Sequence, residues 1–135
     1  MNASHNRGFT LVECAVVCAV ALLLAAVALP SYQGHARRAA RLDAVQALTR
    51  LQSVQEQYRS LHGLYAGEMS VLRGVTPLSD QGRYTLALVL TGPESYRATA
   101  QARGTQAGDL DCSALTLDVN LGFATAGPGP RCWNR

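Results

Sequence analysis

Glu13 is the residue of this sequence whose position most needs a chemical explanation. It lies in a run from Phe9 to Leu29 that is otherwise apolar except for Thr10. A carboxylate in a membrane interior costs about 2–3 kcal/mol on insertion scales and usually has a partner of opposite charge. No basic residue lies within one helical turn of Glu13, so such a partner must come from elsewhere. The alternative is a polar residue tolerated near the membrane edge.

The four cysteines form two pairs with different chemistry. Cys14 and Cys18 stand four residues apart in the apolar run, where one helix face would present both as small packing residues. Cys112 and Cys132 lie near the C-terminus. They are the pair that makes sense as a disulfide, in an oxidising compartment, and two free thiols are the alternative. A bond between them would add roughly 3 kcal/mol of stability.

Other reactive side chains form no catalytic or metal-binding set. His35 and His62 are far apart and have no cysteine or carboxylate at ligand spacing. The segment from Asp109 to Asp111 lacks the glycine and distal glutamate of a calcium loop, so we expect a solvated acidic turn. The sequence therefore predicts no enzyme, no metal and no cofactor.

The charge balance bears on nucleic acid as a partner. The chain has a net charge of +3 and contains no lysine. Alternation along a predicted strand places Arg97 and Arg103 on its exposed side. Aromatic residues interleaved with these arginines, which single-stranded nucleic acid would need, are missing. A solvated face of mixed charge is the favoured interpretation, and nucleic acid is kept as a partner that the sequence does not favour.

The apolar run is long enough to cross a membrane. Its 21 residues would span about 31 Å as a helix, close to the thickness of the hydrocarbon core. A cleaved secretory signal peptide is the alternative, but its apolar part usually has only about 7–15 residues. The basic residues Arg37, Arg38 and Arg41 follow the run closely and, by the positive-inside rule, favour a cytoplasmic location for that side.

The rest of the chain predicts one further helical segment and then a sheet. We expect one long helix from Phe9 to His62, kinked at Pro30 because proline lacks an N–H, and ended by Gly63. Alternation predicts antiparallel strands near 84–90, 96–103 and 115–119, with a fourth near Phe123, after an irregular connection at about 63–81. This is an α+β layout.

The predicted second half of the helix is amphipathic. Apolar residues three or four apart form its expected buried stripe: Leu42, Val45, Leu48, Leu51, Val54, Tyr58 and Leu61. Polar residues form its expected solvent face: Arg41, Gln46, Arg50, Gln57 and Arg59.

The segment "GFTLVE" followed by an apolar helix resembles the prepilin signature of type IV pilins and the related pseudopilins. The resemblance implies that a prepilin peptidase cuts after Gly8 and that the new amino terminus at Phe9 is methylated. It also implies that Glu13 pairs with the terminal amine of a neighbouring subunit and so acts as an assembly charge. The chain departs from many pilins at Leu22, where they have a glycine.

The resemblance extends more loosely over the rest of the chain, through "QYRSLHGLYA", "DCSALTLDVNLG" and the closing "CW". It implies the type IV pilin fold, in which a long kinked helix packs against a 3–4 stranded antiparallel sheet. It divides the chain into a cleaved leader (1–8), a transmembrane and filament-core helix (9–30) and a periplasmic globular domain (31–135). The last of these includes a loop closed by Cys112 and Cys132.

The implied function is that of a structural subunit of a type IV pilus, here interpreted as a minor one, supporting adhesion, twitching motility or DNA uptake. Its implied partners are other pilin subunits, the prepilin peptidase and methyltransferase, the assembly machinery and the membrane. It would stay in the bacterial inner membrane before assembly and in an extracellular filament afterwards. The alternatives are a pseudopilin of type II secretion, a DNA-binding minor pilin for competence, and a conventionally secreted small domain.

Overall fold

The computed structural model describes residues 9–134, so the leader and Gly8 lie outside the described residues. Its long helix, α1, spans Leu11–His62. The predicted helix is therefore confirmed, with its start two residues later than expected and its end at the expected residue. The chain divides into two compact units, Met1–His35 and Ala36–Arg135, and α1 contributes residues to both.

Pro30 does not interrupt α1. Helical structure is continuous on both sides of it and through it. The proline lacks a backbone N–H and so removes one donor from the helix. The expected kink at Pro30 stays a prediction.

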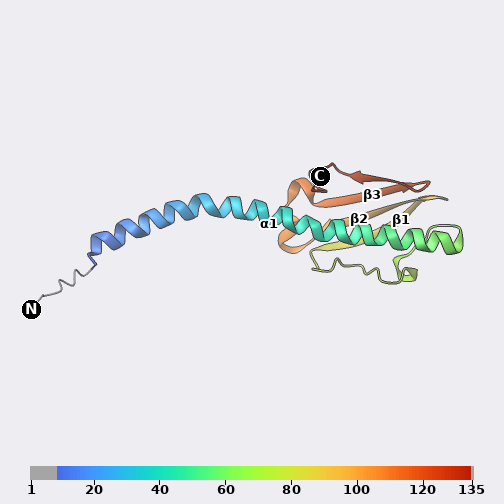
Figure 1. Ribbon diagram of the computed structural model, residues 1–135, viewed down its shortest axis with the longest axis horizontal. Helices are drawn as coiled ribbons and strands as arrows, with labels where there is room; N and C mark the ends of the chain where they lie inside the picture. The colour runs from blue at the N-terminus through green and yellow to red at the C-terminus, as the bar shows by residue number, and fades with distance from the viewer. Residues whose placement is uncertain (1–8, 135) are drawn as a thin grey trace, which may run out of the picture. The chain divides into compact units, whose positions relative to one another are not determined.

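The second unit contains a four-stranded antiparallel sheet with strands in sequence order. The strands are β1 (Tyr84–Gly92), β2 (Ser95–Ala102), β3 (Ala114–Asn120) and β4 (Phe123–Gly127). Figure 1 shows the part of α1 in this unit lying along the sheet. The predicted α+β fold and all four predicted strands, including the one near Phe123, are confirmed.

The alternation of each strand decides which side chains form the core. β2 buries Tyr96, Ala98, Ala100 and Ala102 and turns the residues between them outward. β3 buries the three residues expected from its pattern: Leu115, Leu117 and Val119. Because the period of a strand is two, this register fixes one apolar face against the helix and one face toward solvent.

The helix face that meets the sheet differs from the predicted stripe. Leu42 and Leu61 are 50% and 81% exposed, whereas the helix buries small residues that the prediction did not include. These are Ala40, Ala44 and Ala47, beside the correctly predicted Leu48 and Leu51. Alanines on the helix face the alanine-rich strand β2 in one core cluster, and small residues on both sides allow close packing.

Polar side chains complete this buried helix face and fasten the connection that follows. Gly63 ends α1 with a φ of 78°, a conformation that favours glycine, as predicted. The fully buried Gln55 side chain exchanges two 2.9 Å hydrogen bonds with the backbone of Ala66. The buried Asp43 accepts a 2.6 Å hydrogen bond from the hydroxyl of Ser79. The connection from 63 to 83 is therefore anchored at both ends to α1.

Short 3₁₀ helices complete the chain. One, η1 (Met69–Val71), lies in the connection before β1. Two others, η2 (Gly104–Gly108) and η3 (Leu110–Cys112), join β2 to β3. Helices η2 and η3 bring the chain back to the first residues of α1 in this unit, where they form the polar cluster described below.

Candidate functional site

The N-terminus of α1 places Glu13 in a reciprocal capping arrangement with Thr10. The Thr10 hydroxyl accepts a hydrogen bond from the Glu13 N–H at 3.2 Å, and the Thr10 N–H donates to Glu13 Oε2 at 3.3 Å. Two backbone donors that have no partner inside the helix are thereby satisfied. The sequence reasoning missed Thr10, although the spacing T-x-x-E is the signal for this motif.

The capping arrangement leaves the Glu13 carboxylate at the surface. Thr10 and Glu13 are both exposed, and their hydrogen bonds are exposed too. The helix dipole at an N-terminus favours a negative charge, so the first turn of α1 is a suitable place for a carboxylate. The chain therefore presents a positioned negative charge at the start of its apolar helix.

No described residue covers the apolar part of α1. Every described residue from Phe9 to Leu29 is exposed. The helix is long and apolar enough to cross a membrane, as judged by length and composition. A helix that is apolar on all sides requires a membrane or other protein around it. Cys14 and Cys18 are exposed free thiols here, so their expected role as packing residues needs that surrounding protein.

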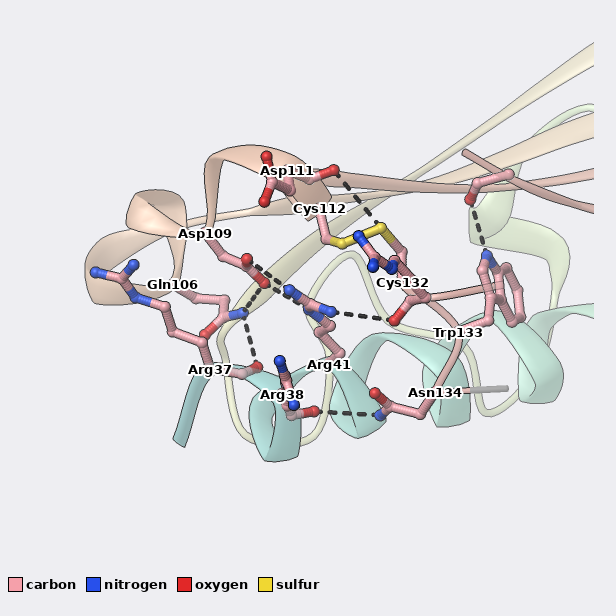
Figure 2. Close-up of a disulfide and its surroundings, with 12 residues drawn as sticks. Arg37, Arg38, Arg41, Gln106, Asp109, Asp111, Cys112, Cys132, Trp133 and Asn134 are labelled. Carbon is pink, nitrogen blue, oxygen red and sulfur yellow. Dashed lines mark hydrogen bonds and ion pairs between the residues drawn. A yellow bond between two sulfur atoms is a disulfide. The ribbon is translucent and has the colours of Figure 1, made fainter. Parts of the chain in front are cut away.

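Cys112 and Cys132 form a disulfide with a Cα–Cα distance of 5.4 Å, which confirms this pair. The enclosed segment contains both β3 and β4. Trp133 is buried in the same core cluster as the two cysteines, and its indole N–H donates to the carbonyl of Gly127 at 2.8 Å. The disulfide thus joins the start of β3 to the end of the described chain (Figure 2).

Beside the disulfide, Arg41 and Asp109 form a buried ion pair that contradicts two predictions. Arg41 was expected on the solvent face and Asp109 in a solvated acidic turn, but their side chains are only 11% and 7% exposed. Two parallel hydrogen bonds of 2.7 and 2.8 Å join them. The hydrogen bond to Asp109 raises the pKa of Arg41, so the guanidinium stays charged. The reason for both errors is the return of η2 and η3 to α1, which local sequence does not reveal.

Gln106 connects this ion pair to the core and to α1. Its side-chain amide contacts Asp109 Oδ2 at 3.1 Å, the Tyr84 hydroxyl at 3.0 Å and the Arg37 carbonyl at 3.2 Å. The pKa of Tyr84 is raised, chiefly by burial. We call Arg41, Gln106 and Asp109 the helix clamp, because they hold the η2–η3 segment against α1 (Figure 2).

The remaining candidate residues are not brought together. Arg97 is exposed, as predicted, and pairs with Asp118 on the neighbouring strand β3. Arg103 is also exposed. His62 stacks on Tyr58 with ring centroids 4.2 Å apart and lies far along the chain from His35. Among residues 9–134, no group of three or more His, Cys, Asp or Glu side chains is arranged to hold a metal ion.

Comparison with known protein families matches residues 3–116 in two adjoining segments. A family model described as type IV minor pilin ComP, DNA uptake sequence receptor, matches residues 30–116. A second model, the prokaryotic N-terminal methylation motif, matches residues 3–29. The boundary between the two segments lies at Pro30.

Similar curated proteins are pilus proteins by name. The fimbrial protein of Neisseria meningitidis serogroup B (strain ATCC BAA-335 / MC58) is 35% identical over 79 residues, covering 58% of this chain and 46% of that protein. The type IV major pilin protein PilE of Neisseria gonorrhoeae is 33% identical over 79 residues, covering 58% and 47%. The chain thus spans about half the length of these neisserial relatives.

A third relative is covered more completely. Prepilin peptidase-dependent protein D of Escherichia coli (strain K12) is 31% identical over 105 residues, covering 64% of this chain and 72% of that protein. The family model for the globular part covers more than half of the chain. With the long helix, the four-stranded sheet and the C-terminal disulfide, these matches show that the chain belongs to the type IV pilin family.

Proposed function

We propose that this chain is a structural subunit of a type IV pilus, made as a prepilin and polymerised from the inner membrane. The observation that carries the proposal is the first part of α1. It exposes apolar side chains on all sides and presents a capped carboxylate, Glu13, at its N-terminus. Such a helix is poorly suited to water and well suited to a membrane before assembly and to other helices afterwards.

The proposed processing takes place between Gly8 and Phe9. A prepilin peptidase would remove residues 1–8, and a methyltransferase would modify the new amine at Phe9. The match to the N-terminal methylation motif over residues 3–29 supports this step. The name of the Escherichia coli relative, a prepilin peptidase-dependent protein, supports it as well.

The proposed role of Glu13 is to pair with the amine of a neighbouring subunit. An unpaired charge in a low-dielectric surrounding is costly, and pairing a carboxylate with an amine reduces this cost for both groups. Thr10 holds the Glu13 carboxylate at the beginning of the helix, because its N–H and its hydroxyl both donate hydrogen bonds to Glu13 Oε2, at 3.3 and 3.2 Å. A neighbour that enters the filament would then find this charge in a defined position.

The proposed topology places the globular domain outside the cytoplasm, in the periplasm first and in the filament later. The Cys112–Cys132 disulfide supports it, because such bonds persist in oxidising compartments. The cluster around Arg37, Arg38 and Arg41 was the argument for the opposite orientation.

DNA binding during uptake is a second candidate function, and it extends the first. The description of the matching family model, a minor pilin and DNA uptake sequence receptor, is the specific observation that favours it. A minor rather than a major subunit fits the same description. Retention of a duplex oligonucleotide by the purified protein, at two salt concentrations, tests this function separately from assembly.

The experiment that tests the main proposal is an intact-mass measurement on protein extracted from membranes and from sheared filaments. We expect both forms to lack residues 1–8 and to carry one added methyl group. A mature chain that begins beyond Pro30 would instead establish a conventional signal peptide. A processed chain that is found in membranes but never in sheared filaments would overturn the role in a filament. This holds for type IV pili and for type II secretion pseudopili.

A further inference from the structure

Five arginines without an ion pair gather at the end of the second unit where its part of α1 begins. We call them the basic collar: Arg37, Arg38, Arg83, Arg103 and Arg131. All five are exposed. The four ion pairs between described residues use other arginines: Arg41, Arg50, Arg59 and Arg97. Among the described residues, no ion pair therefore neutralises a collar arginine.

The helix clamp and the adjoining strands bring the collar together. The N–H of Arg103 donates to the carbonyl of Arg83 at 2.9 Å, so these two residues are adjacent at the ends of β1 and β2. Arg83 precedes Tyr84, whose hydroxyl contacts Gln106, and Gln106 contacts the Arg37 carbonyl. Contacts between described residues thus link three collar positions that are far apart in the sequence.

A cleft beside the disulfide holds the other two collar residues. Arg38 and Arg131 line this cleft, which has a volume of about 710 Å³, together with Cys112, Cys132 and the exposed Asp111. Figure 2 shows the side chain of Arg41 between α1 and the disulfide, with Arg37 extending away on the far side of Gln106. Because Asp109 pairs with Arg41, the described residues at this end leave the five collar arginines with one exposed carboxylate, Asp111.

We propose that the basic collar docks on the anionic headgroups of the membrane in which the subunit is anchored before assembly. This inference rests on the proposed function, because it requires that the apolar helix spans that membrane. Arg37 is only eight positions after Leu29, the last residue of the apolar run. Eight residues span about 12 Å as a helix and at most about 28 Å when extended, so the collar stays within reach of the headgroups.

An exposed apolar residue of the second unit suits the same surface. Leu110, between the two aspartates of the η2–η3 segment, is 83% exposed and can enter the boundary between headgroups and acyl chains. Arginine and an exposed apolar side chain together are typical of a surface that lies on a membrane.

The collar is less suited to nucleic acid bases. Trp133 and Tyr84, the aromatic residues beside it, are 5% and 0% exposed, so neither offers a face for base stacking. Its arginines would still attract phosphate groups, whether these belong to lipid headgroups or to DNA. DNA binding is therefore an outcome that the experiment must separate from docking on the membrane.

The test uses the full chain reconstituted in phosphatidylcholine bilayers with or without phosphatidylglycerol. Trp133 is the one tryptophan of the chain, and it lies next to the cleft. A small amount of lipid with a spin-labelled headgroup quenches its fluorescence when the domain docks. We expect stronger quenching with phosphatidylglycerol, and we expect added salt to weaken it, because salt screens exposed charges.

Variants of the collar give the matched comparison. Each arginine near an anionic membrane contributes about 1 kcal/mol. Arg103→Gln should then lower the ratio of docked to undocked domain about fivefold, and Arg83→Gln with Arg103→Gln about thirtyfold. Arg73→Gln removes an exposed arginine outside the collar and should leave quenching unchanged. Arg83 and Arg103 are chosen because their side chains take no part in the helix clamp.

Two results would overturn the inference. One is equal quenching with and without phosphatidylglycerol in a chain that is fully inserted. The other is a collar variant that loses binding of a duplex oligonucleotide while its lipid-dependent quenching is retained, which would assign the collar to DNA. A chain that carbonate extracts from the membrane would contradict the proposed anchoring itself, so the two failures are distinguishable.

Discussion

Asp109→Asn is a perturbation of the helix clamp whose size can be worked out from the structure. The substitution keeps the shape of the side chain and removes its charge. Arg41 would then stay charged in a site where its side chain is only 11% exposed. It would lose the charge of the partner to which it donates two hydrogen bonds, and it would keep one 3.1 Å hydrogen bond to the carbonyl of Arg131.

Removing one partner of a buried ion pair typically costs about 3–5 kcal/mol, because the other charge is left uncompensated. The remaining bond to Arg131 and the partial exposure of Arg41 favour the lower end, about 3 kcal/mol. Domains of this size have unfolding free energies of about 5–15 kcal/mol, so the loss is a large fraction. The corresponding decrease in Tm is about 12–24 °C.

The assay is urea unfolding of the full chain in detergent micelles, followed by the fluorescence of Trp133. This residue is 5% exposed and lies in the core cluster with both disulfide cysteines, so its signal reports on the second unit. Asp80→Asn is the control. It breaks the Arg50–Asp80 pair, whose side chains are 49% and 56% exposed, and should change stability little.

Equal stability of Asp109→Asn and Asp80→Asn would refute the reasoning, because it would mean that water reaches Arg41 freely. The double variant Arg41→Met with Asp109→Leu gives a further check. Replacing both charges with apolar groups removes the uncompensated charge, so it should recover part of the stability that Asp109→Asn loses. A double variant that is less stable than Asp109→Asn would also contradict this account.

Three further predictions concern the disulfide, a buried tyrosine and the helix cap. Replacing Cys112 and Cys132 by serine should lower the unfolding free energy by roughly 3 kcal/mol, as measured by urea unfolding. An unchanged free energy would show that pairing of the strands inside the loop stabilises the loop without the disulfide. Tyr96→Phe should not destabilise the domain at neutral pH, because the buried Tyr96 hydroxyl has no hydrogen-bond partner among the described residues. Burial raises the pKa of Tyr96, so the unfolded chain loses this proton first and stability falls as pH rises above about 10; Tyr96→Phe should move alkaline unfolding to higher pH, and an unchanged transition would contradict this. Thr10→Ala should weaken the first turn of α1 by about 1 kcal/mol, seen as roughly fivefold faster amide exchange at Glu13, whereas Thr10→Ser should retain the wild-type rate.

The sequence predicted the fold well where the pattern is local. The strands follow from alternation, and the end of α1 follows from Gly63, whose φ of 78° favours glycine. The cysteine pairing followed from elimination, since Cys14 and Cys18 belong to the apolar helix. These features depend on residues close in sequence or on a small number of alternatives.

The helix face and the helix clamp could not be predicted in the same way. Large apolar residues suggested a stripe through Leu42 and Leu61, but α1 buries its alanines in the core cluster that also contains the alanines of β2. Arg41 and Asp109 are 68 positions apart, and nothing near either residue indicates the other. Thr10 is a different case, because its spacing to Glu13 is a local signal that the reasoning overlooked.

The most direct test of assembly through Glu13 is the amount of Glu13→Gln protein in sheared filaments divided by the amount in membranes, compared with wild type. Membrane insertion should be retained, since a neutral amide is cheaper to bury than a carboxylate. We expect the ratio to fall about tenfold or more, which corresponds to about 1.4 kcal/mol, because the neighbour's amine loses its opposite charge. A smaller loss would indicate a subunit at the filament tip, with a partner on one side only. An unchanged ratio would contradict the account and leave apolar packing alone as the force that brings the subunit into the filament.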